Sequence, residues 1–334
     1  MTLKYKGVNY DTGIRYTPGY LTLAVFDEPS IRRDIGVIAG QLHCNSVMIL
    51  GTDGDRLRQT ATIAHQAGLS VWLQPRLFDA GITETLEHLK TVAQSAEALR
   101  LDGAEVILVL GCELTIFLKG LMPGRSWGIR ARLLAVLWPL LPVFSWRLNR
   151  YLARARSVVR SEFSGSITYA AGSWERVDWN DFDLVGVNLY RDRSNRLGYR
   201  GTVRSLLEHS KPTVITEFGC CTYEGAQAKG GGGQTIIDWR KVPPVLKGNP
   251  RRSEHAQAEL LSELIELYQE EGVDGAFVYA FSEPSNPHSG SPEHDLDTAS
   301  YGIVKVMPTA VGEPPRWEPK KAFDEVARRF GSVS

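Results

Sequence analysis

Two glutamates each stand at the end of a short apolar run, which is an unusual place for a charged side chain. Glu113 follows residues 106–112, and Glu217 follows residues 212–216. An apolar run of this length is typical of a strand that is buried on both faces. A carboxylate just past such a strand must emerge at its end, where barrel enzymes keep their catalytic groups. Two carboxylates placed in this way can act as a paired acid and base.

This pair of carboxylates suits the cleavage of a glycosidic bond. That reaction needs one carboxylic acid to protonate the leaving oxygen and a second carboxylate to attack the sugar or to activate water. It requires no cofactor, and we expect none. The structural alternative is that each glutamate forms an ion pair with an arginine such as Arg76 or Arg191. That interpretation is the simpler one for either glutamate alone, but their joint placement favours catalysis.

The elements that must position these glutamates recur at nearly regular intervals. Eight apolar runs predict strands at residues 6–10, 46–50, 70–74, 105–110, 166–170, 184–189, 213–216 and 275–280. Segments with helical periodicity lie at residues 29–41, 55–67, 84–99, 143–161, 202–209, 254–271 and 320–330. Only the link between the fifth and sixth runs, around residues 174–181, is too short for a full helix. Strands that alternate with helices predict a parallel sheet, and eight such units predict closure into a barrel.

We therefore predict an α/β fold, a (β/α)8 TIM barrel in which residues 1–334 form a single domain. The competing fold is an open doubly wound sheet, which normally has a glycine-rich phosphate turn after its first strand. Residues 11–15 contain one glycine and no such spacing. The tetraglycine at residues 230–233 lacks a bracketing strand and helix at the required spacing, so we interpret it as a flexible lid tip.

Three insertions are expected to surround the barrel mouth and to shape a substrate pocket. They cover about residues 115–146, 220–250 and 282–301, after the fourth, seventh and eighth strands. Within the first insertion, residues 127–146 are largely apolar. Residues 127–144 nevertheless contain two prolines and two arginines. The uninterrupted apolar part is shorter than the ~20 residues of a membrane-spanning helix. This segment could form a lid, a protein contact or a membrane-surface helix.

Imidazole and carboxylate side chains cluster in the last insertion, where they could hold a metal ion. The cluster consists of Glu283, His288, His294, Asp295 and Asp297. Its spacing matches no known metal motif, and the segment is polar and rich in proline. We therefore interpret it as a solvated lid and predict no metal site.

In strand order the chain resembles the large clan of retaining glycoside hydrolases that have a (β/α)8 barrel. The resemblance covers nearly the whole chain, and its more specific motif is Thr-Glu-Phe-Gly at residues 216–219. It implies that Glu113, at the end of the fourth strand, is the acid/base. It likewise implies that Glu217, at the end of the seventh, is the nucleophile. Tyr190, two residues after Asn188 at the end of the sixth strand, stands where the clan often keeps a tyrosine that hydrogen-bonds the nucleophile.

The resemblance also suggests substrate-binding residues. Asn9 and Tyr10 lie in a Gly-x-Asn opening like that of several member families, and Asn188 accompanies the tyrosine described above. Trp174, after the fifth strand, and Tyr279, on the eighth, are candidate sugar-stacking surfaces, because a flat aromatic face covers the apolar side of a sugar ring. Either aromatic side chain could instead belong to the core.

Two departures from the clan's pattern stand near the glutamates. The clan usually has asparagine immediately before the acid/base, where its amide contacts the sugar 2-hydroxyl, but this chain has Cys112. A thiol is a weak hydrogen-bond donor. Loss of the amide contact to the 2-hydroxyl could therefore remove several kcal/mol of transition-state stabilisation. The arginine expected on the second strand is also missing, and Arg76 or Arg15 could take its place. These gaps indicate a divergent member of the clan, similar to bacterial proteins that carry the label abortive infection protein, a name that describes no chemistry.

Composition limits the classes of partner. Lysine plus arginine and aspartate plus glutamate both number 38, so no net charge favours nucleic acid. The resemblance to glycoside hydrolases implies a carbohydrate or glycoside as the ligand. The N-terminal residues show no charged-then-apolar leader, which predicts a cytoplasmic protein. The four cysteines, at positions 44, 112, 220 and 221, have neither a disulfide framework nor a metal-binding spacing.

Two other classes of function remain open. The chain could be a degenerate barrel that binds a carbohydrate or a protein partner, which the cysteine at position 112 and the apolar insertion would both suit. It could also be an intracellular transglycosidase that uses the same two glutamates. An activity screen on aryl glycosides and product analysis with alcohol acceptors separate these possibilities from hydrolysis.

Overall fold

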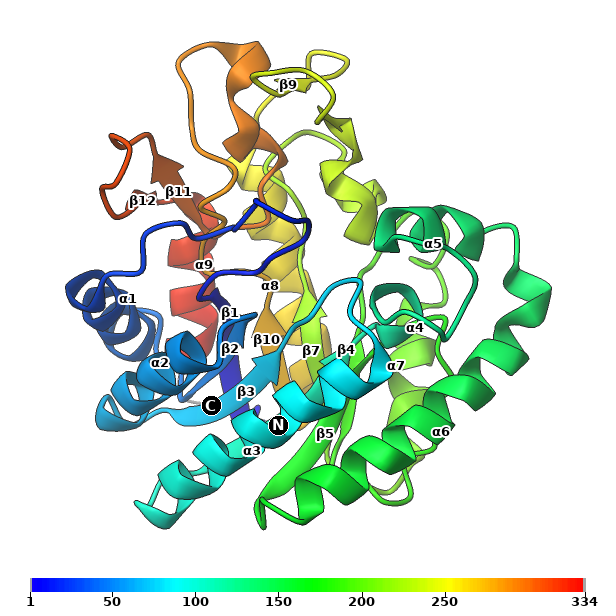
Figure 1. Ribbon diagram of the computed structural model, residues 1–334. Helices are drawn as coiled ribbons and strands as arrows, with labels where there is room; N and C mark the ends of the chain where they lie inside the picture. The colour runs from blue at the N-terminus through cyan, green and yellow to red at the C-terminus, as the bar shows by residue number, and fades with distance from the viewer. Residues whose placement is uncertain (1, 333–334) are drawn as a thin grey trace.

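The computed structural model describes residues 2–332 and confirms the predicted barrel. Eight parallel strands close in the order β1-β10-β7-β6-β5-β4-β3-β2 (Figure 1). They are β1 (Tyr5–Asp11), β2 (Ser46–Gly51), β3 (Ser70–Pro75), β4 (Val106–Cys112), β5 (Ser166–Gly172), β6 (Val185–Asn188), β7 (Thr213–Phe218) and β10 (Gly275–Val278). Each of the eight predicted runs overlaps one of these strands.

Helices surround the barrel at the predicted places. They are α1 (Glu28–Gly40), α2 (Gly54–Gln66), α3 (Ile82–Leu101), α6 (Leu141–Arg160), α7 (Tyr199–Leu207), α8 (Glu254–Glu271) and α9 (Lys321–Gly331). Local sequence features fix where some of these helices begin and end. The Asp27 carboxylate accepts from the Ser30 amide and so caps the start of α1. Gly272 adopts a left-handed conformation and ends α8. The link between β5 and β6, which is described throughout, contains no helix, as expected.

The barrel interior is filled by side chains rather than by a channel. Trp72 stands at its centre, with its ring 5.1 Å from that of Tyr5 and 4.9 Å from that of Phe277. Aliphatic residues from other strands complete this inner cluster, and a second, larger core lies between the strands and the helices. Burial on both faces explains why the strands are apolar throughout.

The three insertions supply the additional elements. After β4 come α4 (Leu114–Phe117), α5 (Trp127–Leu134) and the 3-10 turn η1 (Trp138–Leu140). After β7 come η2 (Ala226–Ala228), η3 (Gly230–Ile236), β8 (Ile237–Asp238) and β9 (Val245–Leu246). After β10 come η4 (Pro292–His294), η5 (Leu296–Ala299) and the hairpin of β11 (Val304–Met307) and β12 (Arg316–Pro319). Figure 1 shows these segments gathered around the carboxyl ends of the strands.

Two of the predicted loops are packed rather than free. The tetraglycine belongs to η3, where the Gly233 amide donates to the Tyr301 hydroxyl at 2.9 Å and that hydroxyl donates to the Gly230 carbonyl at 2.6 Å. A Cβ on Gly233 would stand 2.5 Å from the Cys221 sulfur. Gly230 and Gly233 are therefore buried and hydrogen-bonded to Tyr301, unlike the free tip that we expected, whereas Gly231 and Gly232 are not buried.

The loop after β10 is likewise not a solvated lid. Asp297 is fully buried and forms ion pairs with Arg252, at 2.7 Å, and with Lys320, at 3.0 Å. Asp295 contacts His288 at 2.9 Å. Two of the acidic residues considered as metal ligands therefore have cationic or imidazole partners within the protein, and no group of three or more potential ligands suited to a metal ion occurs among residues 2–332.

Candidate active site

Glu113 lies on a sharp turn between β4 and α4. Its backbone is left-handed, with φ of 46°, and its amide donates to the Ala170 carbonyl of β5 at 3.0 Å. A non-glycine residue in this conformation is strained, and such strain is common at functional sites. Burial, and then the charge of nearby Glu217, raise the pKa of the Glu113 carboxyl to about 8. Glu113 therefore keeps its proton at neutral pH.

Glu217 is the second-last residue of strand β7, and its partners differ from those of Glu113. The Tyr190 hydroxyl donates to its Oε2 at 3.0 Å, and the Arg76 guanidinium forms a close ion pair with its Oε1. Both Arg76 and Glu217 are almost fully buried. Charge-assisted hydrogen bonds of this kind hold a side chain in one orientation.

Asn188 and Cys112 connect the two glutamates. The Thr216 hydroxyl donates to Asn188 Oδ1 at 2.8 Å, which directs the amide nitrogen of Asn188 toward Glu113 Oε1, at 3.0 Å. That nitrogen also lies 3.3 Å from the sulfur of Cys112, which is 3.7 Å from Glu217 Oε1. The carboxyl ends of β4, β6 and β7 therefore bring both carboxyl groups to one place.

Irregular strand pairing surrounds this place. The register between β4 and β5 shifts between Val109 and Cys112, and that between β6 and β7 shifts between Val187 and Asn188. Such irregularities locally re-aim side chains and are frequent beside active sites.

A buried network that the sequence did not reveal holds the turn after Glu113. The Tyr169 hydroxyl accepts from the Leu114 amide at 2.7 Å and donates to Glu175 at 2.8 Å. Glu175 also accepts from the Thr115 amide at 2.9 Å. Glu175 follows no apolar strand directly, so the signal that singled out Glu113 and Glu217 could not find it.

The two candidate residues of the first strand, Asn9 and Tyr10, have different surroundings. Asn9 is buried, and its amide donates to the Thr216 carbonyl at 3.0 Å, so it supports the strand that carries Glu217. The Tyr10 hydroxyl donates to Asp34 of α1 at 3.0 Å, which places this ring on the helix side of the barrel and not with the glutamates. Of the two arginines considered, Arg76 contacts Glu217, whereas Arg15 is exposed.

The two predicted stacking residues also differ. Trp174 is partly buried and packs over Gly172, where an added Cβ would lie 2.6 Å from the indole ring. Tyr279 packs edge-on against Tyr190, with ring centroids 6.5 Å apart, and against Tyr301, at 5.8 Å. The predicted eighth strand ends at Val278, and the peptide between Tyr279 and Ala280 is cis.

A cavity of about 400 Å³ opens beside Tyr279. Its volume is within the range usual for small-molecule sites. Aromatic and polar side chains dominate its wall, which consists of Asp11, Tyr16, Thr17, Tyr20, Thr22, Leu50, Trp127, Gln234, Trp239, Tyr279, Ala280, Ser282, Glu283, Ser285 and Asn286. Neither glutamate of the pair is part of this wall, but Tyr279 joins the cavity to Tyr190 and through it to Glu217.

Two carboxylates of this cavity were not singled out as substrate-binding residues. Burial raises the pKa of Glu283 to about 7, although it accepts from the Tyr301 amide at 2.7 Å and from Gln234 at 2.8 Å. Burial also raises the pKa of Asp11. Asp11 ends the first strand, so the rule that identified Glu113 could have found it. Glu283 stands in a loop and offers no such signal.

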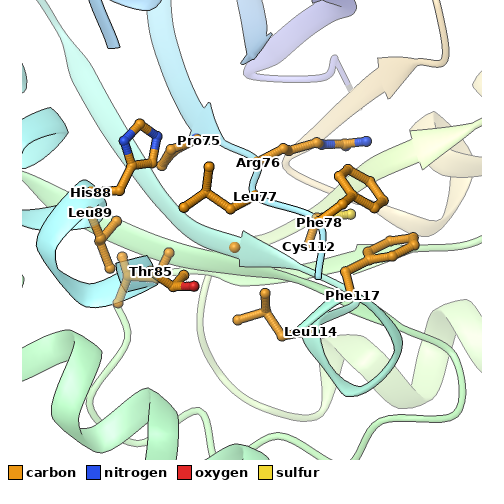
Figure 2. Close-up of a pocket in the computed structure, with 12 residues that line it drawn as sticks. Pro75, Arg76, Leu77, Phe78, Thr85, His88, Leu89, Cys112, Leu114 and Phe117 are labelled. Carbon is orange, nitrogen blue, oxygen red and sulfur yellow. The ribbon is translucent and has the colours of Figure 1, made fainter. Parts of the chain in front are cut away.

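A much smaller cavity, of about 20 Å³, lies between the ends of β3 and β4 and helix α3. Figure 2 shows Arg76 extending past Phe78 and Cys112, with its guanidinium pointing away from His88. A space of this size holds about one water molecule, so it is too small for a sugar. Its apolar wall instead packs around the base of Arg76 and helps to fix its direction.

Solved glycosidases share this fold. The chain matches a GH113 β-1,4-mannanase over 99% of its own length and 100% of the other chain, with a TM-score of 0.65 and 14% identity. For the GH113 β-mannanase of Alicyclobacillus acidocaldarius, the TM-score is 0.58 and the identity 19%, over 99% and 98% of the two chains. For a β-glucosidase, the TM-score is 0.57 and the sequence identity 13%, over 98% of each of the two chains. These similarities define the class of fold, a (β/α)8 barrel as found in glycoside hydrolases. No protein-family model and no curated protein matches the sequence.

Proposed function

We propose that this protein is a glycoside hydrolase that acts by a retaining mechanism. The observation that carries the proposal is the contrast between two neighbouring glutamates. Glu217 contacts a guanidinium and accepts from a hydroxyl. Among residues 2–332, Glu113 accepts only from the neutral amide of Asn188, and its pKa is raised to about 8. Two neighbouring carboxyl groups with different partners, one of them a candidate proton donor and the other held in place for attack, are the arrangement that glycoside cleavage requires.

In the proposed mechanism, the Glu217 carboxylate attacks the anomeric carbon while Glu113 gives its proton to the leaving oxygen. Once the covalent glycosyl-enzyme has formed, Glu113 is ionised and takes a proton from the attacking water, which releases the sugar with its configuration retained. Tyr190 and Arg76 hold Glu217 in place for attack. Retention requires carboxyl groups about 5–5.5 Å apart, because inversion needs room for a water between them.

The substrate class that we propose is a β-linked hexoside. The solved structures of similar fold include β-1,4-mannanases and a β-glucosidase, which supports a β-glycoside over an α-glycoside. The cavity of about 400 Å³ beside Tyr279 offers room for a sugar unit, with Tyr16, Trp127 and Trp239 as aromatic walls. Tyr279 and Tyr190 lie between this cavity and Glu217.

The test is to trap the glycosyl-enzyme. Incubation with an activated 2-deoxy-2-fluoro β-mannoside or β-glucoside should label Glu217, and peptide mass spectrometry identifies the labelled residue. Glu217→Ala should lose all labelling and turnover, and azide should restore turnover with inverted product. Labelling of another residue, or turnover by Glu217→Ala without azide, contradicts the proposal.

One observation favours a second candidate, a carbohydrate-binding barrel without catalysis. Cys112 stands beside Glu217, where a thiol is a poor donor to a sugar hydroxyl. If wild type cleaves no aryl glycoside while Glu217→Ala retains affinity for an oligosaccharide in calorimetry, binding is the function. Transfer to an added alcohol acceptor, seen as alkyl glycoside product, would instead indicate a transglycosidase.

A further inference from the structure

The corner at which α5, η1 and α6 meet exposes an unusual amount of apolar surface. Five large apolar side chains within residues 136–146 are exposed, and Trp138 and Trp146 are the largest, with 68% and 57% of their surface accessible. The others are Val136, Leu140 and Val143. We call these five residues the apolar corner. Contiguous exposed apolar surface of this kind marks a site of interaction.

Helix α6 continues the apolar corner with a basic stripe. One face of α6 packs on the barrel through Phe144, Leu148, Tyr151, Leu152, Ala155 and Val159. The outer face carries Val143 and Trp146 first and then, at spacings of three and four residues, Arg150 and Arg154. The Arg150 guanidinium lies 4.9 Å from the Trp146 ring. The outward face therefore changes from apolar to cationic along the helix.

The surrounding segment is strongly basic, although the whole chain has no net charge. Residues 114–161 contain nine lysines and arginines and not one aspartate or glutamate. Three of the nine, Arg130, Arg156 and Arg160, form ion pairs with carboxylates elsewhere. The remaining six form none within residues 2–332, so their charge is available to an outside partner.

We propose that the apolar corner and the basic stripe together dock on the surface of an anionic lipid bilayer. Tryptophan prefers the boundary between headgroups and acyl chains, and arginine binds the phosphates above it. A second copy of the chain is a poor occupant, because it would bring six unpaired cations against six others. An uncharged partner would leave the same cations without any role.

The shape of the segment suits insertion at the surface rather than passage across it. Among the described residues no single helix is long and apolar enough to cross a membrane, and the only pair of helices that qualifies together is bent by 96° between Trp127–Leu134 and Trp138–Arg160. Figure 1 shows α5 and α6 meeting at a corner that projects from the side of the barrel. The bend presents the apolar residues at its tip, so they can enter the headgroup region without unfolding.

Docking would also orient the barrel mouth. Trp127, the first residue of α5, lines the cavity of about 400 Å³, and its indole donates to the Tyr16 carbonyl at 3.0 Å. The insertion that carries the apolar corner therefore also supplies one residue of the cavity wall, which links the docked segment to the barrel mouth. The docking itself does not depend on the proposed catalytic function.

The test is sedimentation of the full chain with vesicles. Vesicles of phosphatidylcholine alone should bind little protein, whereas vesicles with about a third phosphatidylglycerol should bind it at low salt and release it as the salt concentration rises. Arg150→Glu combined with Arg154→Glu should lower the partition coefficient by at least tenfold, since each basic side chain near the surface contributes about fivefold. Trp138→Ser with Trp146→Ser should lower it by a similar factor.

Matched variants exclude a general effect of surface mutation. Leu197 and Val311 are more exposed than either tryptophan and lie outside the segment, so Leu197→Ser with Val311→Ser should bind vesicles as wild type does. All variants should keep the circular dichroism and melting temperature of wild type. Equal binding to neutral and anionic vesicles, or wild-type binding by either test variant, overturns the proposal. So does a concentration-dependent dimer that the tryptophan variant abolishes, because the corner would then be a protein interface.

Discussion

Glu113 and Glu217 are both glutamates and are linked in space through Asn188 and Cys112, but their side chains have different hydrogen-bond partners. A guanidinium and a phenolic hydroxyl reach Glu217, while a single amide reaches Glu113 and burial keeps it protonated.

Glu113→Gln should change the dependence of turnover on pH. In wild type the acid form of Glu113 is lost as the pH rises through about 8, so turnover of a glycoside with a poor leaving group should fall above that pH. The variant should lose at least 10²-fold on that substrate. On a dinitrophenyl glycoside, whose leaving group needs no proton, its glycosylation step should show no alkaline limb. A limb that persists in the variant would assign the titration to another group.

The same substitution should change the dependence of stability on pH. The pKa of Glu113 is higher in the folded protein, at about 8, than its ordinary value of 4.5, so the unfolded chain releases this proton first. Stability conferred by the protonated carboxyl is therefore complete below about pH 4.5 and is lost as the pH rises toward 8. Between these limits the free energy of unfolding of wild type should fall, relative to Glu113→Gln, by of order 3 kcal/mol. Urea unfolding at pH 5 and pH 8.5 measures the difference, and parallel profiles would refute it.

Tyr190→Phe should impair catalysis more than folding. It removes the hydroxyl that donates to Glu217 at 3.0 Å, and the loss of one such donor costs about 10²-fold in kcat. Tyr151→Phe is the matched control, because its buried hydroxyl has no hydrogen-bond partner in the part of the chain that the structure describes. Steady-state kinetics should show wild-type kcat for the control. Equal kcat for Tyr190→Phe and wild type would remove Tyr190 from the catalytic residues.

At the scale of elements, the insertions are part of the packed structure. Gly233 of η3 lies against Tyr301 and Cys221, and Tyr301 in turn packs against Tyr190 and Tyr279. The insertion after β7 thus supports the aromatic residues beside the glutamates. This close approach explains the glycine at position 233.

Adjacent glycines of η3 test this interpretation. A Cβ on Gly233 would meet the Cys221 sulfur at 2.5 Å and the Tyr301 hydroxyl at 2.9 Å, whereas one on Gly232 would meet nothing within 4 Å. Gly233→Ala should therefore lower the free energy of unfolding by about 1–3 kcal/mol through overpacking. Gly232→Ala should leave it within about 0.5 kcal/mol of wild type. Chemical unfolding compares them, and equal stabilities would indicate that η3 is loosely held.

At the scale of the whole molecule, a buried ion cluster connects distant parts of the chain. Asp297, from the loop after β10, contacts Arg252 before α8 and Lys320 before α9. Lys320 also donates to the Thr222 hydroxyl at 3.0 Å. These contacts fasten two of the insertions to the helices that close the barrel.

Lys320→Met should be severely destabilising, because it leaves Asp297 with only one of its two cations. Removal of one partner from a buried ion pair costs about 3–5 kcal/mol. Lys305→Met is the control, since its pair with Glu318 at 2.7 Å is near the surface, where water and salt screen the attraction. Thermal unfolding should show the larger loss for Lys320→Met. Similar losses would mean that Arg252 alone neutralises Asp297.

The sequence by itself determined the barrel and the two glutamates, because both follow from local pattern. Strands buried on both faces are apolar throughout, and helices begin and end at residues such as Asp27 and Gly272 whose side chains or backbone act locally. A charged residue directly after such an apolar run can therefore be recognised in the sequence.

Only the tertiary structure decided which side chains meet those glutamates. A strand that is apolar on both faces carries no alternation, so the pattern could not say that Asn9 faces inward while Tyr10 faces α1. The same holds for the choice of Arg76 over Arg15 and for the role of Asn188 between the carboxyl groups. These contacts join residues far apart in the chain, and they depend on the closure and register of the barrel, which no short segment encodes.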